Sequence, residues 1–136
     1  MKYLLDVSAL VAFGFHEHEF HPRMTSWVSD LEAHPEIEFL TCSITELGFV
    51  RVLSQTVQYG CTVADARGIL LQLKTNDQVN FTFIADHHDI SQLPLWVRLP
   101  KQVTHGHLAR LARAHNAVLA TLDTKIPQAL VIPAAK

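Results

Sequence analysis

The chain has 136 residues, of which 49% are hydrophobic and 18% charged, and its formal net charge is −2. This length predicts one domain over residues 1–136, and the composition excludes a disordered or collagen-like protein. The charge also disfavours nucleic-acid binding through a basic surface alone. No apolar run reaches the roughly 20 residues that span a bilayer. Two cysteines are too few for a disulfide framework, so we expect a reduced, cytoplasmic protein without membrane contact.

The first third of the chain alternates β-rich runs with helical patterns. Residues 2–6 form an apolar run that ends in an acid, which predicts a strand. A compact helix is expected over residues 8–15. After a polar stretch, apolar residues recur at helical spacing over residues 24–31 and indicate an amphipathic helix. Residues 37–42 predict the second strand.

Two further helices are expected in the middle of the chain. Ser43 is expected to open the first of them, and the second covers residues 62–74. The side chains expected to face inward on these helices are Ile44, Leu47, Val50, Leu53, Val63, Ala66, Ile69, Leu70 and Leu73.

The last part of the chain completes an alternating α/β pattern. It predicts a strand over residues 79–85, a proline-containing loop over 91–103 and a helix over 105–115. Two more strands are expected over residues 117–122 and 129–132. Strands separated by helices predict a three-layer α/β/α sandwich with a mostly parallel central sheet. Sites in such sheets form beyond the carboxyl ends of the strands, so acids at those ends are candidate site residues.

Three acids occupy such ends. Asp6 closes the first strand, Glu46 lies in the first turn of the helix after the second strand, and Asp123 closes the fourth strand. Each also has a simpler interpretation. Asp6 can cap the following helix, Glu46 can complete a capping box with Ser43, and Asp123 can form a turn.

Taken together, the three acids predict a metal site. Carboxylates that lie close together repel one another and raise one another's pKa unless a cation intervenes. Mg²⁺ or Mn²⁺ prefers oxygen ligands and keeps several waters. Such ions activate water and stabilise the leaving oxygen when a phosphodiester is cleaved.

Three segments carry a family resemblance, namely LLDVSAL, SITELGFVRVL and VTHGHLARLARAHNAVLATLD. Together they resemble the three motif blocks of PIN-domain ribonucleases, and most closely the VapC toxins of bacterial toxin–antitoxin pairs. The resemblance implies a parallel α/β/α fold and metal-dependent endoribonuclease activity, commonly on structured RNA such as tRNA. It also implies inhibition by a small antitoxin and a homodimer. By position, Asp6, Glu46 and Asp123 match three acids of the family, and Ser8 and Thr121 match hydroxyl residues that flank the site.

The sequence departs from the family pattern at one position. The family usually has Thr-Asp at the start of the helix before the last site strand, whereas this chain has Thr104 and His105. Three roles for His105 remain open. It can be a ligand that shifts the metal preference toward Mn²⁺, since imidazole suits Mn²⁺ better than Mg²⁺. It can act as an acid or base. Alternatively, one metal position is lost, and the chain is a catalytically weak module that binds RNA or an antitoxin.

Several cations and one aromatic residue are candidates for substrate contact. Arg51 lies five residues after Glu46 on the same predicted helix. It can bind phosphate or hold a neighbouring carboxylate, and a surface ion pair is the simpler alternative. The cations Arg98, Arg110 and Arg113 suggest a phosphate track without forming a dense patch in the sequence. Trp96 is expected to pack in the core or against a partner.

The other histidines favour structural roles. Residues 16–21 are rich in histidine but lack the spacing of a helical zinc motif, so we expect a polar connector. The alternative is a loop that borders the active-site groove. The pair His87 and His88 has the same two interpretations, and Asp86 is an additional candidate for the site rim. His107 is expected to point away from His105 on the same helix.

Overall fold

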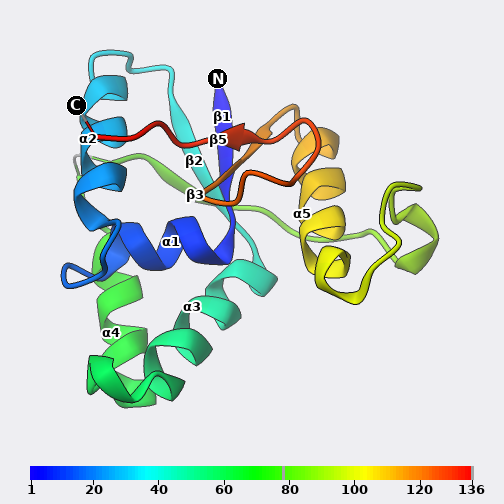
Figure 1. The fold of residues 1–136 in the computed structure, drawn as a ribbon. Coiled ribbons are helices and arrows are strands. Elements are labelled where there is room, and N and C mark those ends of the chain that lie inside the picture. The colour runs from blue at the N-terminus through cyan, green and yellow to red at the C-terminus, as the bar shows by residue number, and fades with distance from the viewer. Residues whose placement is uncertain (78, 136) are drawn as a thin grey trace.

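A computed structural model describes residues 1–77 and 79–135 of the chain (Figure 1). In this part of the chain, parallel strands form a five-stranded sheet in the order β3-β2-β1-β4-β5. The strands are β1 (Lys2–Leu5), β2 (Glu38–Thr41), β3 (Phe81–Phe83), β4 (Val118–Thr121) and β5 (Leu130–Val131). Each lies within its predicted range and is shorter than that range. The predicted α/β fold with a parallel sheet is confirmed.

The helices follow the predicted alternation. They are α1 (Val7–Gly14), α2 (His21–Leu31), α3 (Ser43–Gln55), α4 (Val63–Lys74) and α5 (Val103–Ala114), with short 3-10 turns η1 (Val57–Tyr59), η2 (Ile90–Gln92) and η3 (Pro100–Gln102). The α2 helix starts earlier than its apolar stripe, because Pro22 is well suited to a first helical turn. Among the residues that the structure describes, no helix is long and apolar enough to cross a membrane.

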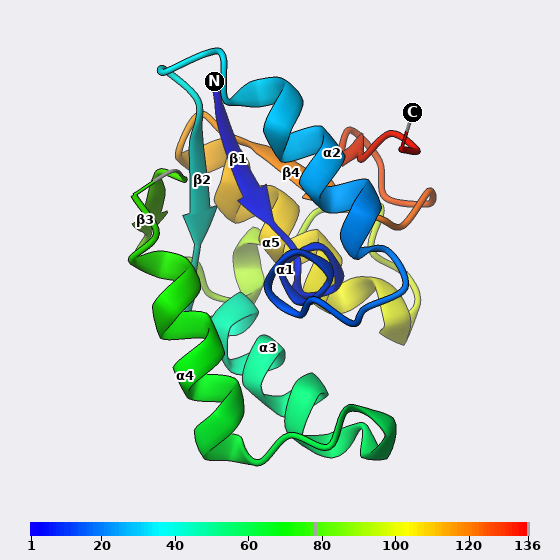
Figure 2. The same ribbon diagram turned by 90° about the vertical axis from the view of Figure 1, so that its left-hand side faces the viewer.

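Two layers of helices cover the two faces of the sheet. Side chains alternate between faces along a strand, so Leu4 and Leu5 of β1 enter different cores, and both are fully buried. Leu5 packs in a core with residues of α1, α2, α3 and α4, whereas Leu4 packs with residues of α5. Figure 2 shows α1 and α2 in front of the sheet and α5 behind it, with α3 and α4 projecting below.

The predicted inward faces of α3 and α4 are partly wrong. Leu47 is 71% exposed and Val63 is 55% exposed. The buried face of α3 instead contains Phe49 and is centred on Gly48, where an added Cβ would lie 2.5 Å from a methyl carbon of Val7. A pattern of large apolar residues misses this face, because a glycine is what allows α3 to approach α1 so closely.

Candidate functional site

The site lies where the order of the strands reverses. The chain runs from β1 to β2 on one side and returns to β4 on the other, so the carboxyl ends of β1 and β4 border the crevice where α/β proteins bind ligands. Asp6 follows β1 directly, and its N–H donates to the Ala120 carbonyl of β4. Thr121 ends β4. The sheet therefore places these two side chains next to each other.

Asp6 is fully buried, and hydrogen bonds fix its carboxylate. Its Oδ1 accepts the Ser8 hydroxyl (2.9 Å) and the Ala9 N–H (2.8 Å), while its Oδ2 accepts the Thr121 hydroxyl. The Ala9 bond makes Asp6 the N-cap of α1, as the simpler interpretation predicted. A cap uses only Oδ1, so capping leaves Oδ2 at the sheet edge. The hydroxyls of Ser8 and Thr121 lie beside Asp6, and their contact with substrate stays a prediction.

Burial gives Asp6 unusual electrostatics. Loss of water raises the pKa of its carboxyl above the ordinary value, and this effect outweighs the lowering by the hydrogen bonds from Thr121, Ala9 and Ser8 and by nearby His105. The charged form is therefore disfavoured, and a positive group beside it would restore it. Such a costly carboxylate at a sheet edge is typical of a functional site.

His105 lies between the two strand-end aspartates. It belongs to the first turn of α5, and its Nε2 is 3.6 Å from Asp6 Oδ2 while its Nδ1 is 3.9 Å from Asp123 Oδ2. The Asp123 side chain is 40% exposed and also accepts the Lys125 N–H at 2.9 Å, as a turn former does. The structure thus brings together three of the predicted site residues, one buried and two open to solvent.

The fourth predicted residue, Glu46, is held by a different partner. Its Oε2 accepts the Thr41 hydroxyl at 2.6 Å and lies 2.6 Å from the Lys74 ammonium. Lys74 ends α4, so this ion pair joins α3 to α4. Sequence reasoning missed Lys74, because a lysine in the last turn of a helix is explained by the helix dipole alone. The pair depends on how α4 packs against α3.

The capping box predicted for Ser43 and Glu46 is wrong. Cys42 has an extended backbone and is the N-cap of α3, so the helix begins one residue earlier than the box requires. The N–H of Cys42 donates to the Thr45 hydroxyl at 3.0 Å, which fills the position assigned to the glutamate. Glu46 is therefore free of the capping role. Arg51, further along α3, is exposed, and its contact with phosphate stays a prediction.

The side chains at the site are of the types that bind a divalent cation, but they are not positioned to hold one as they stand. Two carboxylates and an imidazole are suitable ligands, and a cation would offset the buried charge of Asp6. Within residues 1–77 and 79–135, however, no three His, Cys, Asp or Glu side chains are arranged to hold an ion as they stand. Binding would require the side chains of Glu46, His105 and Asp123 to turn.

A second acid–histidine cluster lies along α5, away from this site. His107 Nε2 forms a hydrogen bond with Asp86 Oδ2, and His88 Nδ1 lies 3.7 Å from Asp86 Oδ1. The backbone N–H of His88 also donates to Asp86 at 3.0 Å. His107 therefore points away from His105, as predicted. The cluster ties the segment after β3 to α5.

Solvent reaches the candidate site through a groove of about 550 Å³. His105 and Asp123 line this groove, together with Lys101, Lys125 and Trp96 among others. The site is therefore open enough for a polymer chain to approach, and cations lie beside its acids.

The known proteins that the chain resembles all carry the name Ribonuclease VapC. The chain is 36% identical to Ribonuclease VapC38 of Mycobacterium tuberculosis (strain ATCC 25618 / H37Rv), over 90% of this chain and 86% of that protein. It is 33% identical to Ribonuclease VapC44 of Mycobacterium tuberculosis (strain CDC 1551 / Oshkosh), over 100% and 96%. Ribonuclease VapC29 of the same strain is 31% identical over 91% and 87%. No protein-family model matches the chain.

Proposed function

Because the chain belongs to the VapC family of PIN-domain ribonucleases, we propose that it is a divalent-metal-dependent endoribonuclease and the toxin of a toxin–antitoxin pair. The observation that carries the proposal is the buried carboxylate of Asp6, which lies at the sheet edge with His105 and Asp123 beside it. A structural cap does not need a fully buried charge next to a second acid and a histidine.

The proposed ion is held by Asp6, Asp123 and His105, and by Glu46 once Lys74 releases it. Mg²⁺ or Mn²⁺ would supply an activated water and offset the charge that develops on the phosphate. The nitrogen of His105 favours Mn²⁺ over Mg²⁺.

The protein's own side chains orient this centre. Ser8 and Thr121 hold the Asp6 carboxylate in one orientation, with its Oδ2 3.6 Å from Nε2 of His105, which lines the groove. Asp123 and His105 are partly exposed and line that groove, where a phosphodiester can reach them. Arg51 is proposed to bind phosphate from the α3 side.

A second candidate function rests on Glu46. In the structure its carboxylate is neutralised by Lys74 and lies outside the group formed by Asp6, His105 and Asp123. This pairing favours a catalytically weak module that binds RNA or an antitoxin, in which His105 has replaced an acid that the reaction needs.

The partners we propose are RNA, such as tRNA, a cognate antitoxin and a second copy of the chain. Exposed apolar side chains support the two protein partners. Leu47, Val57 and Leu71 on α3, η1 and α4 are 71%, 90% and 59% exposed, on the part of the molecule that projects from the sheet. Exposed apolar side chains on a projecting part of a molecule are candidates for protein contacts where they form a patch.

The test is cleavage of a structured RNA by the purified chain, with analysis of the new ends. Attack by activated water leaves a 5′-phosphate and a 3′-hydroxyl, and EDTA is expected to stop the reaction. A 2′,3′-cyclic phosphate formed in EDTA would instead show acid–base catalysis by histidine and overturn the metal mechanism. Absence of cleavage together with RNA binding would support the second candidate.

Calorimetric titration with Mn²⁺ separates the two metal outcomes. We expect saturable binding that Asp6→Asn removes. If Mn²⁺ does not bind, the acids act only as caps and turn formers.

A further inference from the structure

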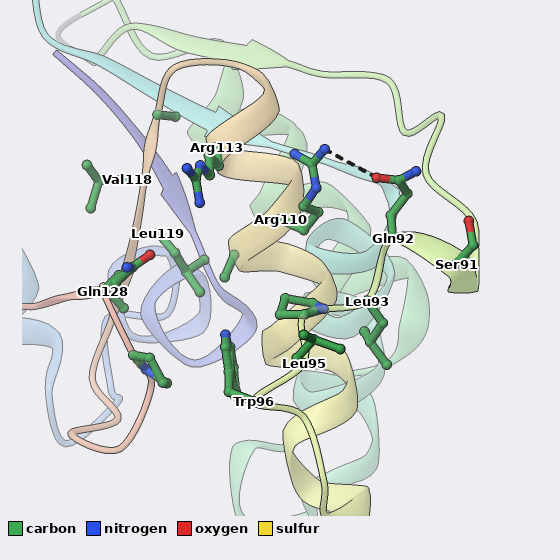
Figure 3. A pocket seen from close by; sticks show the side chains of 15 residues that line it. Ser91, Gln92, Leu93, Leu95, Trp96, Arg110, Arg113, Val118, Leu119 and Gln128 are labelled. Carbon is green, nitrogen blue, oxygen red and sulfur yellow. Dashed lines mark hydrogen bonds between the residues drawn. The ribbon is translucent and has the colours of Figure 1, made fainter.

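Two grooves on the surface of the molecule meet at one tryptophan. The groove that contains His105 and Asp123 is also lined by Trp96. A larger groove of about 720 Å³ is lined by Trp96 as well and continues between α5, the segment before it and the loop after β4 (Figure 3). Trp96 is half-buried against the core beneath α5. Trp96 therefore borders both grooves, which together are called the path below, and the smaller of the two contains His105 and Asp123 of the candidate site.

Cations gather along this path. Lys101 and Lys125 line the groove next to the site, and Arg110 and Arg113 line the larger groove. These are four of the chain's 11 lysines and arginines. Of the described residues that line either groove, Asp123 at the site itself is the only carboxylate. A chain with a net charge of −2 thus has a locally positive track, which the sequence order alone does not reveal.

The fold fixes the geometry of the larger groove. Arg110 and Arg113 are three residues apart on α5 and both line the larger groove; in Figure 3 the Arg110 side chain reaches toward Gln92, whereas Arg113 lies on the side of Leu119. Arg110 donates a hydrogen bond to the Gln92 side-chain carbonyl at 3.2 Å, which holds its guanidinium over the groove. The segment that contains Trp96 sits directly on α5 because residue 106 is glycine. An added Cβ there would lie 2.2 Å from Val97.

We propose that this path binds a single-stranded segment of RNA adjoining the scissile phosphate, with one base stacked on Trp96 and the backbone phosphates held by the four cations. The inference rests on the proposed function and specifies where its substrate lies. Aromatic faces beside cations are the general means by which proteins hold single strands, because every base offers a flat face and every nucleotide a charge.

RNA fits the path better than an antitoxin segment does. The smaller groove of the path contains Asp123 and His105, so a strand that presents its phosphate to them must leave along a neighbouring surface. An acidic peptide would also meet the cations, but it has no need of the site at the end of the track. Binding of a protein partner to this path is one of the outcomes that the experiment below distinguishes.

The experiment measures quenching of tryptophan fluorescence by single-stranded 2′-O-methyl RNA in EDTA, so that cleavage plays no part. Trp27 is only 6% exposed, and Trp96 is the tryptophan within reach of a base. We expect saturable quenching that Trp96→Phe removes from the signal. Trp96→Leu lacks the reporter, so its binding is followed by the anisotropy of fluorescein-labelled 2′-O-methyl RNA, and it should be roughly 5- to 150-fold weaker than that of the parent, which corresponds to the loss of one stacked base.

The arginines are tested by their effect on salt dependence. The double variant Arg110→Gln/Arg113→Gln should weaken binding about tenfold or more and flatten the slope of log Kd against log salt by about 1.4, which is the value for two phosphate contacts on a single strand. Arg67→Gln is the matched control, because Arg67, like Arg113, is exposed on a helix but lies on α4, outside both grooves. It should leave both quantities unchanged.

The outcomes separate this inference from the function on which it rests. If the parent protein cleaves RNA while the Trp96→Leu and double-arginine variants bind it normally, the path is wrong and the nuclease stands. Absence of quenching in the parent protein also overturns the path. If the variants bind RNA normally but lose a co-purified protein partner, the surface belongs to that partner. If the parent protein shows no metal-dependent cleavage, but the Trp96→Leu and double-arginine variants lose RNA binding as expected, only the nuclease function is rejected.

Discussion

Two acid–histidine clusters join α5 to segments that follow strands, and they differ in how far water reaches the acid. Asp6 is fully buried beside His105, whereas Asp86 keeps 25% of its side-chain surface exposed beside His107. Burial dominates at Asp6 and raises the pKa of its carboxyl. At Asp86, desolvation acts in the same direction, but hydrogen bonds from His88 and His107 and their charges outweigh it and lower the pKa.

The comparison shows that similar residue types can serve opposite purposes. In the Asp86 cluster the histidines stabilise the charged acid, so the cluster behaves as a clasp between a loop and a helix. In the Asp6 cluster, burial destabilises the charged carboxylate, and a bound cation would stabilise it. We therefore expect changes at Asp6 to affect activity and changes at Asp86 to affect stability.

The largest expected effect is the loss of cleavage in Asp6→Asn. Removing the fixed, buried charge should lower the rate of RNA cleavage at least about 100-fold, as measured by single-turnover kinetics with Mn²⁺. The matched variant Asp86→Asn should change the rate less than about threefold, because that acid lies outside the groove that leads to the site. Equal losses in the two variants would remove the distinction between the clusters.

A smaller effect is expected from His105→Asp. A third carboxylate in place of the imidazole should raise the ratio of Mg²⁺-supported to Mn²⁺-supported cleavage rates on the order of tenfold. His107→Gln, in the other cluster, should leave the ratio as it is. If the ratio does not move in His105→Asp, this side chain does not contact the ion. A large gain in total Mg²⁺-dependent activity would show that the histidine had weakened the site.

Lys74→Met tests whether the ion pair with Glu46 competes with the metal. The side chains of the pair are 24% and 22% exposed, so the pair contributes about 1 kcal/mol or less. Releasing Glu46 should therefore lower the Mn²⁺ concentration for half-maximal cleavage about fivefold or less. Lys2→Met is the control, because Lys2 begins β1, whereas the candidate site lies at the carboxyl end of that strand. A higher Mn²⁺ requirement in Lys74→Met would mean that the lysine holds Glu46 where the reaction needs it.

The fold was accessible from the sequence because strands and helices leave local patterns. The run that ends in Asp6 and the alternation of short apolar runs with helical stripes determine a parallel α/β sheet. The inward face of α3 was not accessible, since Gly48 has no side chain to contribute to a hydrophobic pattern. Only the packed structure shows that α3 approaches α1 at this residue.

The site was predicted to the extent that it depends on strand ends. Asp6 and Asp123 follow neighbouring strands of a parallel sheet, so their proximity follows from topology. The partner of Glu46 was not predictable, because Lys74 is 28 residues away and meets it only through packing between two helices. The track through Trp96 was predicted only in part, since Arg110 and Arg113 were candidates for phosphate contact but Lys101, Lys125 and the shared Trp96 were not connected with them. Its cations lie in separate segments that the fold brings together.

The smallest effect, and the one that contrasts the two acids most directly, is the pH dependence of stability. The folded-state pKa of Asp6 lies above its ordinary value of 3.8. Below pH 3.8 the carboxyl is protonated in both the folded and the unfolded protein, so its ionisation does not change the free energy of unfolding. As the pH rises toward the folded-state pKa, the unfolded chain loses its proton first, so the free energy of unfolding falls by at most about 1.4 kcal/mol per pH unit. Asp6→Asn lacks this loss and should become more stable relative to the parent as the pH rises.

Asp86 should show the opposite sign, because its folded-state pKa lies below 3.8. Its contribution is present above pH 3.8 and is lost as the pH falls through the folded-state value, so Asp86→Asn should be less stable than the parent at neutral pH and approach it in acid. Urea unfolding of the three proteins without metal, between about pH 2 and pH 7, measures both trends, with the Asp86 trend below pH 3.8 and the Asp6 trend above it. If Asp6→Asn is stable at neutral pH, its loss of cleavage is not a loss of folding. Parallel trends in the two variants would show that burial does not distinguish the acids.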